Sequence, residues 1–201
     1  MSVVLQNPSL RSPYQPTTSP RQRVRQRGFT LIEILIVIAI AAGMLFGVFT
    51  VANRIGERSA INELASNLNM MAAETRSAFR AQGTYLGVTP AVLIGMGIPP
   101  ATIVSGGTIR SPWDTAIDVQ PTRITAPNDA VQFSISGVPS ASCAALVTAA
   151  EGAFGRVLIG STVVKNMTAM APSPMSPLNA ATVGTNCAGT GPHTIHFVLG
   201  R

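Results

Sequence analysis

The residues of this sequence that could do chemistry are few, and the most unusual is a single carboxylate inside an apolar run. Glu33 is the only charged residue among the 24 residues from Phe29 to Ala52. A charge near the centre of a membrane helix costs about 2.5 to 3.5 kcal/mol on insertion scales, so a lone carboxylate usually has a cationic partner. We therefore expect Glu33 to meet a positive charge in the apolar zone. The alternative is that it reaches the cytoplasmic membrane interface unpaired.

The junction Arg27-Gly28-Phe29 stands immediately before this run rather than after it. An ordinary secretory signal has an apolar core of about 7 to 15 residues, followed by a cleavage site between small residues. Here the apolar run is longer, and cleavage after Gly28 would leave all of it on the mature protein. Phe29 would then carry a free α-ammonium group, which is a cation in the same apolar zone as Glu33.

The other reactive side chains do not predict a catalytic or metal site. His193 and His196 lie three residues apart in an expected strand, so they point to opposite faces and are poorly placed to share a metal ion. Glu151 is the only acid after Asp129, which leaves no paired-carboxylate or multi-carboxylate site in the C-terminal segment. We expect no enzyme activity, no cofactor and no metal, and structural roles for both histidines.

The element that carries Glu33 is expected to be a helix that crosses a membrane. A helix from Phe29 to Ala52 would be about 36 Å long, against a hydrocarbon core of about 30 Å. Hydrophobic residues make up 46% of the chain and charged residues only 11%, less than half of the roughly 25% that is usual in soluble proteins. Part of the chain therefore lies in lipid or against copies of itself.

Positive charge is concentrated before this helix. The net charge is +6, from 14 Lys and Arg against 8 Asp and Glu, and removing the five arginines of residues 1–28 leaves 9 against 8, or +1. The positive-inside rule keeps residues 1–28 in the cytoplasm and exports the chain after residue 53. A basic tail that touches DNA is the alternative, but we expect no direct nucleic-acid binding because the basicity belongs to the leader. The five arginines are Arg11, Arg21, Arg23, Arg25 and Arg27.

Helical spacing continues beyond the membrane segment. It predicts one helix over residues 29–82, ending at Gly83, with residues 29–52 in the membrane and an amphipathic second half. The residues of its apolar stripe follow one another at intervals of three and four, and they are Ile61, Leu64, Leu68, Met71, Thr75 and Ala78.

Residues 83–201 are richer in Gly, Pro, Ser, Thr and Ala and predict one exported globular domain. We expect an α+β fold, in which the long N-terminal helix packs on an antiparallel β-sheet. Within the domain we expect a loop-rich connection over 84–115, a helix with a serine cap over 140–150, and irregular surface structure over 167–189, facing either the medium or a neighbouring molecule. Alternating patterns predict strands at 116–120, 131–135, 157–164 and 194–199.

The chain has two cysteines, Cys143 and Cys187, both in the part that we expect to be exported. In an oxidising compartment an isolated pair is most simply a disulfide, which would close the region 143–187. Two free buried thiols are the alternative.

The sequence GFTLIE at residues 28–33 resembles the class III signal of type IV prepilins. The 28-residue leader is similar to that of the type IVb subclass, and the context FSISGVPSASCAAL, residues 133–146, is similar to the major pilins of conjugative thin pili. Phe29 departs from the Met, Leu or Trp with which many type IVb pilins begin. The resemblance implies that a prepilin peptidase cuts after Gly28, that the new N-terminus at Phe29 is methylated, and that Glu33 pairs with Phe29 of an adjacent subunit.

The resemblance also implies a function. It predicts a structural pilus subunit that polymerises through its N-terminal helix into an extracellular filament for conjugation, adhesion or aggregation. The expected partners are other copies of the chain, the prepilin peptidase, the assembly machinery of the bacterial inner membrane, and membrane lipid before assembly. The alternatives are a type II secretion pseudopilin or minor pilin and, from another class, a single-pass membrane-anchored enzyme or binding domain.

Overall fold

The computed structural model describes residues 30–168 and 175–201, with the backbone alone described for residues 49–55. The chain divides into two compact units, Met1–Leu45 and Phe46–Arg201, and each is described by itself. Helix α1, Leu31–Phe79, has 49 residues and belongs to both units. The predicted Gly28 and Phe29 lie outside the described residues.

Helix α1 ends three residues before the predicted boundary at Gln82. Residues 80–82 form a turn in which the Gln82 N–H donates to the Phe79 carbonyl over 3.2 Å. Gly83 follows with φ of +66°, a left-handed conformation that glycine adopts readily and that commonly ends a helix. The predicted stripe is buried from Ile61 to Thr75, but its last member was wrong, because Ala78 is exposed and Phe79 is buried instead.

Residues 84–115, expected to be loop-rich, contain short regular elements. Helix α2, Pro90–Gly95, begins after Thr89, whose side chain accepts a hydrogen bond from the Val92 N–H as an N-cap. A 3-10 turn, Ala101–Ile103, and a small hairpin follow. The hairpin pairs β1, Val104–Ser105, with β2, Thr108–Ile109, around a turn at Gly106-Gly107.

The main sheet has five strands in the order β3-β4-β7-β5-β6, and every neighbouring pair is antiparallel. The last strand of the chain therefore lies in the middle of the sheet, between β4 and β5. The expected strand over 157–164 is in fact two strands, β5 and β6, joined by a turn at residues 160 and 161. The five strands are β3, Ile117–Thr122; β4, Ala130–Val138; β5, Arg156–Ile159; β6, Thr162–Asn166; and β7, His193–Gly200.

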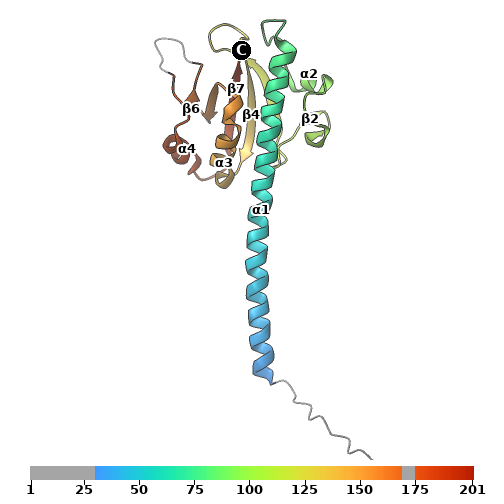
Figure 1. Ribbon diagram of the computed structural model, residues 1–201, viewed down its shortest axis with the longest axis vertical. Helices are drawn as coiled ribbons and strands as arrows, with labels where there is room; N and C mark the ends of the chain where they lie inside the picture. The colour runs from blue at the N-terminus through green and yellow to red at the C-terminus, as the bar shows by residue number, and fades with distance from the viewer. Residues whose placement is uncertain (1–29, 169–174) are drawn as a thin grey trace, which may run out of the picture. The chain divides into compact units, whose positions relative to one another are not determined.

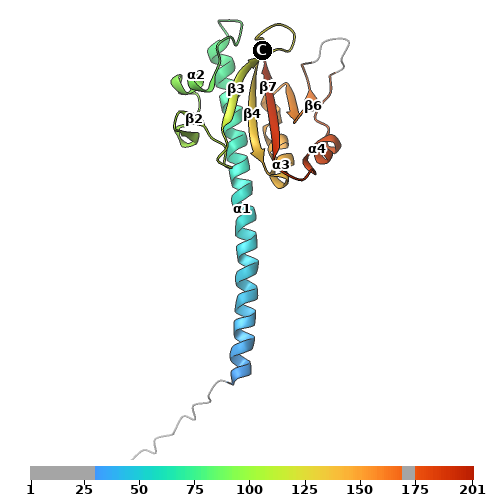
Figure 2. The same cartoon turned by 180° about the vertical axis from the view of Figure 1, so that it is seen from behind.

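One face of the sheet packs against helices. In Figures 1 and 2 the part of α1 in the larger unit and α3, Ser140–Ala150, lie over the same face, and Figure 2 shows the opposite face without a helix over it. Buried residues alternate along the central strands, and Phe133 of β4 is paired with Phe197 of β7. Phe154 contacts both rings, with centroids 5.8 Å and 5.0 Å away, and so links the region after α3 to the core. The predicted α+β fold is confirmed.

The end of β4 has a bulge that positions the start of α3. The β4–β7 register shifts between Ile135 and Val138. Gly137 has φ of +75°, and a Cβ there would come within 2.6 Å of the Thr115 side chain, so the bulge requires glycine. The predicted helix over 140–150 has the observed bounds of α3, but the predicted serine cap was wrong. Pro139 is the capping residue and makes no side-chain hydrogen bond.

Candidate functional site

The first candidate region is the exposed apolar part of α1. Residues Leu31–Val48 have a mean hydropathy of 2.7 over 18 residues, and none of this window is buried. Its length and composition are sufficient to cross a membrane. Large side chains such as Phe46 and Leu31 are more than 70% exposed, so this segment must be covered by lipid or by another protein surface.

Glu33 lies in the first turn of α1, where the helix dipole favours a negative charge. Its backbone N–H donates to the Thr30 carbonyl over 3.0 Å. Among the described residues, its exposed side chain has no hydrogen-bond or ion-pair partner. A partner for this carboxylate must therefore come from the undescribed N-terminal residues or from another molecule. The pairing of Glu33 and the cleavage junction at Gly28 and Phe29 stay predictions.

The second candidate region is closed by the disulfide between Cys143 and Cys187. The two Cα atoms are 5.6 Å apart, and the residues are separated by 44 positions. Cys143 lies in α3, and Cys187 ends α4, Ala180–Cys187. Both cysteines are buried, and the region that they close contains β5 and β6, which extend the sheet beyond β7. The disulfide thus fastens this extension of the sheet to the helix layer.

Helix α4 corrects the expectation of irregular structure over 167–189. Asn179 caps it by accepting a hydrogen bond from the Thr182 N–H over 3.1 Å. Val183 is buried, and the helix places Cys187 against α3. Part of the expected irregular surface, residues 169–174, lies outside the described residues.

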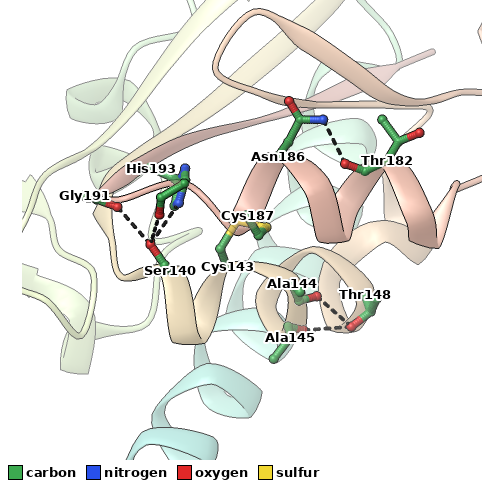
Figure 3. Close-up of a disulfide and its surroundings, with 11 residues drawn as sticks. Ser140, Cys143, Ala144, Ala145, Thr148, Thr182, Asn186, Cys187, Gly191 and His193 are labelled. Atoms are coloured by element: carbon green, nitrogen blue, oxygen red, sulfur yellow. Dashed lines mark hydrogen bonds between the residues drawn. A yellow bond between two sulfur atoms is a disulfide. The ribbon is translucent and has the colours of Figure 1, made fainter.

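Ser140 is a second link beside the disulfide, as Figure 3 shows. Its hydroxyl oxygen lies 2.7 Å from the Gly189 carbonyl oxygen, 3.1 Å from the Gly191 carbonyl oxygen and 3.1 Å from Nε2 of His193. These contacts join the first turn of α3 to the segment between α4 and β7. The sequence predicted only a serine cap for this helix and did not indicate the tertiary role of Ser140, because its partners are about 50 residues away in the sequence.

A largely buried lysine side chain connects the end of α3 to β6. The Lys165 ammonium group donates to the Glu151 carbonyl oxygen over 2.7 Å and forms an ion pair with the Glu151 carboxylate. The Lys165 side chain is 11% exposed, so this ion pair replaces much of the hydration that the ammonium group loses.

The two histidines lie in different surroundings, and among the described residues they share no hydrogen-bond partner. His193 contacts Ser140, whereas Nδ1 of His196 lies 2.9 Å from the Ser134 hydroxyl and 3.1 Å from the Gln132 side-chain nitrogen. Burial lowers the pKa of His196, so it is a neutral imidazole near pH 7. Within residues 30–168 and 175–201, no three His, Cys, Asp or Glu side chains are placed to hold a metal ion.

Asp129 organises the turn between β3 and β4 and was not recognised from the sequence. Its carboxylate accepts hydrogen bonds from the backbone N–H groups of Ile124, Thr125 and Ala126, each 2.7 or 2.8 Å long, and from the Thr125 hydroxyl over 2.5 Å. Burial alone would raise its pKa, but these hydrogen bonds outweigh burial and hold the pKa well below its usual value. The turn sequence PNDA, residues 127–130, was the available signal for this arrangement.

Two family models match the chain. The model described as PilS N terminal matches residues 58–200, which is most of the larger unit, and the prokaryotic N-terminal methylation motif matches residues 23–49. The second match covers the junction at Gly28 and the apolar part of α1 that contains Glu33.

The similar curated proteins and solved structures are pilins. The toxin coregulated pilin of Vibrio cholerae serotype O1 is 26% identical over 204 residues, covering 88% of this chain and 91% of that protein. The crystal structure of TcpA, a type IV pilin from the V. cholerae El Tor biotype, gives a TM-score of 0.56 at 20% identity and covers 70% of this chain and 98% of that one. The type IVb pilin from Salmonella typhi gives 0.52 at 18% identity, with coverages of 68% and 97%.

Proposed function

Since the chain belongs to the PilS family of type IV pilins, we propose that it polymerises through its N-terminal helix into an extracellular filament that serves conjugation, adhesion or aggregation. The observation that carries this proposal is the exposed apolar segment Leu31–Val48 at the start of a helix whose later residues are part of a packed core. One face of α1 packs in the core of the globular domain, which we call the head, while no described residue covers the side chains of its first turns. Copies of the same segment can cover one another once they leave the membrane.

Maturation precedes assembly in this proposal. A prepilin peptidase cuts after Gly28 on the cytoplasmic side, and the new α-amino group of Phe29 is methylated. The match of the methylation motif to residues 23–49 supports this step. Removal of residues 1–28 takes away five arginines and leaves a chain whose apolar helix begins at its N-terminus.

The cleavage also creates the partner that Glu33 needs. The ammonium group of Phe29 and the carboxylate of Glu33 are four residues apart, and in a staggered array of helices the carboxylate of one subunit can reach the N-terminus of the next. The Glu33 side chain is exposed and has no partner among residues 30–168 and 175–201, and this supports an intermolecular partner. Pairing the two charges removes the penalty of leaving each one alone in an apolar environment.

The precursor lies in the bacterial inner membrane, with its leader in the cytoplasm and its head exported. The positive charge before the helix and the buried disulfide between Cys143 and Cys187 both support this orientation. Before assembly the apolar helix is covered by lipid, and the assembly machinery of the inner membrane transfers it from lipid to the filament.

A shearing experiment tests this function. Cells that express the chain are sheared, and the released fraction is compared with the membrane fraction by electron microscopy and quantitative immunoblotting. We expect released filaments in which this chain is the dominant subunit. Retention of all of the protein in the membrane fraction would contradict the proposal and favour a membrane-anchored binding domain or enzyme. Filaments in which this chain is only a trace component would indicate a minor pilin or pseudopilin.

A further inference from the structure

The strongest unassigned feature lies where α1 ends beside the end of β7. A cavity of about 410 Å³ opens there, a volume within the range of small-molecule sites. Three of the side chains that line it are arginines, and none is acidic. We call this feature the arginine cavity, and it is lined by Arg76, Phe79, Arg80, Gly83, Thr84, Tyr85 and Arg201.

The positive charge of the arginine cavity is largely uncompensated. Arg76 is held by two hydrogen bonds from its guanidinium group to the Gly200 carbonyl oxygen, which carries no net charge. The side chains of Arg80 and Arg201 have no hydrogen-bond or ion-pair partner among the residues that the structure describes.

The acid in the adjoining turn forms no ion pair with these arginines. The Tyr85 N–H donates to the Asn128 carbonyl, which brings the turn before β4 next to the cavity lining. Asp129 lies in this turn, but its two carboxylate oxygens accept four hydrogen bonds from Ile124, Thr125 and Ala126. The donors of Arg80 and Arg201 therefore stay available for a ligand.

Two aromatic rings form the apolar part of the lining. Phe79 and Tyr85 are buried, and their ring centroids lie 5.9 Å apart. Burial raises the pKa of Tyr85, although Arg76 and Arg201 partly oppose this effect, so the phenol keeps its proton and can donate a hydrogen bond. The lining thus combines guanidinium and phenol donors with an aromatic surface.

The guanidinium group of Arg201 lies close to Gly83, just after the end of α1. A Cβ added to Gly83 would lie 2.6 Å from Nη2 of Arg201, so glycine leaves the space that this guanidinium occupies. Arg76 on α1 and Arg80 in the turn that follows it also line a second hollow of about 300 Å³. The three cationic groups thus come from two elements that are distant in sequence and meet at one place.

We propose that the arginine cavity binds a small oxyanion, a carboxylate, phosphate or sulfate group, attached to a ring or another apolar body. Guanidinium groups match these anions because two parallel N–H donors fit two oxygens. The aromatic side chains accept the body of the ligand. The oxyanion belongs either to a free small molecule or to an acidic side chain of a second copy of the chain.

Direct binding measurements test the site with two defined probes, inorganic phosphate and phenyl phosphate. The full chain is purified in a non-ionic detergent, and saturation is followed by ligand-observed NMR at low salt and again at high salt. We expect saturable binding in the range of about 1 mM or tighter, with phenyl phosphate binding more tightly than phosphate. Binding should weaken as salt rises, because the attraction is between charges.

The variants are chosen so that the fold is not disturbed. Arg80→Gln and Arg201→Gln each remove a charge that has no structural partner, and each should weaken phosphate binding about tenfold, as expected for one charge-assisted hydrogen bond. Arg58→Gln is the matched control, because Arg58 is an exposed arginine of the same helix, 18 residues or about 27 Å before Arg76. It should leave binding unchanged.

Absence of saturable binding, or equal weakening by Arg58→Gln and Arg80→Gln, would overturn the proposal, because the second result indicates only general charge attraction. Equal affinities for the two probes would contradict the role of the aromatic lining. The same titration on sheared filaments distinguishes the two sources of the oxyanion. If the filaments still bind phosphate, the ligand of the cavity is a free small molecule. If only the solubilised chain binds phosphate, an acidic side chain of a neighbouring copy occupies the cavity in the filament.

Discussion

The guanidinium group of Arg76 in α1 donates two hydrogen bonds, of 3.2 and 3.4 Å, to the carbonyl oxygen of Gly200 at the end of β7. These residues are 124 positions apart, so the contact fastens the last strand of the sheet to the end of the long helix. Because β7 is the central strand, this contact helps to hold the sheet on the helix that we propose to carry assembly.

The first prediction concerns this contact. Arg76→Met keeps most of the aliphatic stem but removes both hydrogen bonds, and it should lower the free energy of unfolding by about 1 to 2 kcal/mol. Urea unfolding of the solubilised chain, followed by the fluorescence of the single tryptophan Trp113, measures this change. Arg80→Met is the matched control and should stay within about 0.5 kcal/mol of the wild type. Equal stability of the Arg76 variant and the wild type would mean that the contact contributes nothing to the fold.

The second prediction concerns assembly. Glu33→Gln removes the charge that we propose to pair with the N-terminus of an adjacent subunit. The unpaired ammonium group would then cost about 3 to 5 kcal/mol if the site is fully dry, and less if water reaches it. The variant should be processed, folded and inserted in the membrane, yet few or no filaments should appear in the sheared fraction. Wild-type filament yield would show that the pairing is dispensable.

The third prediction concerns the disulfide between Cys143 and Cys187. Its closed loop spans 44 positions, for which the loop-entropy model gives about 4 kcal/mol of stabilisation. Cys143→Ser should lower the unfolding free energy by a value of this order and reduce the level of the protein in cells. Wild-type protein measured under reducing conditions is the control and should behave like the variant. Recovery of both cysteines as free thiols from native filaments would refute the structural role.

The fourth prediction concerns pH and Asp129. The folded-state pKa is lowered, so the stability that this carboxylate contributes is fully present above the unfolded value near 3.9 and is lost as pH falls towards the folded pKa. Asp129→Asn replaces one accepting oxygen with a donor that faces backbone N–H groups, and at pH 7 it should lower the unfolding free energy by about 1 to 2 kcal/mol.

Unfolding measured between pH 7 and pH 2 tests the Asp129 prediction, since the difference between variant and wild type should shrink below about pH 4. Asp118→Asn is the control, because Asp118 is exposed on β3 and has no hydrogen-bond partner among the described residues. A difference that stays constant down to the lowest pH would contradict the assignment of the stabilisation to the Asp129 carboxylate.

Helices with a clear apolar pattern could be predicted from the sequence. When one face of a helix is buried, apolar residues recur at the helical period. The stripe from Ile61 to Thr75 placed α1, and the apolar run over 140–150 gave the observed bounds of α3. Prolines and small residues concealed α4, whose short amphipathic pattern is stabilised by the Asn179 cap and by the disulfide at Cys187. The turn between β5 and β6 was missed because apolar residues lie on both sides of it, at 157–159 and 163–164, and together they resemble one strand.

Some contacts of the site residues could be predicted from the sequence, and others could not. The disulfide between Cys143 and Cys187 could be predicted, because the chain has only two cysteines and both lie in the part that we expect to be exported. The contacts of Ser140 with Gly191 and of Arg76 with Gly200 could not, because they depend on tertiary approach between segments about 50 to 124 residues apart. Local sequence specifies the period and ends of an element, but not which distant backbone carbonyl a polar side chain will reach.

The central claim is that cleavage after Gly28 creates the subunit that assembles, and the intact mass of the subunit in sheared filaments tests it most directly. We predict a mass that corresponds to residues 29–201 with one added methyl group and with the Cys143–Cys187 disulfide intact. Gly28→Ala should block processing and abolish the released filaments, while leaving an uncleaved protein in the membrane. Assembled, surface-exposed protein that still begins at Met1 would contradict the account.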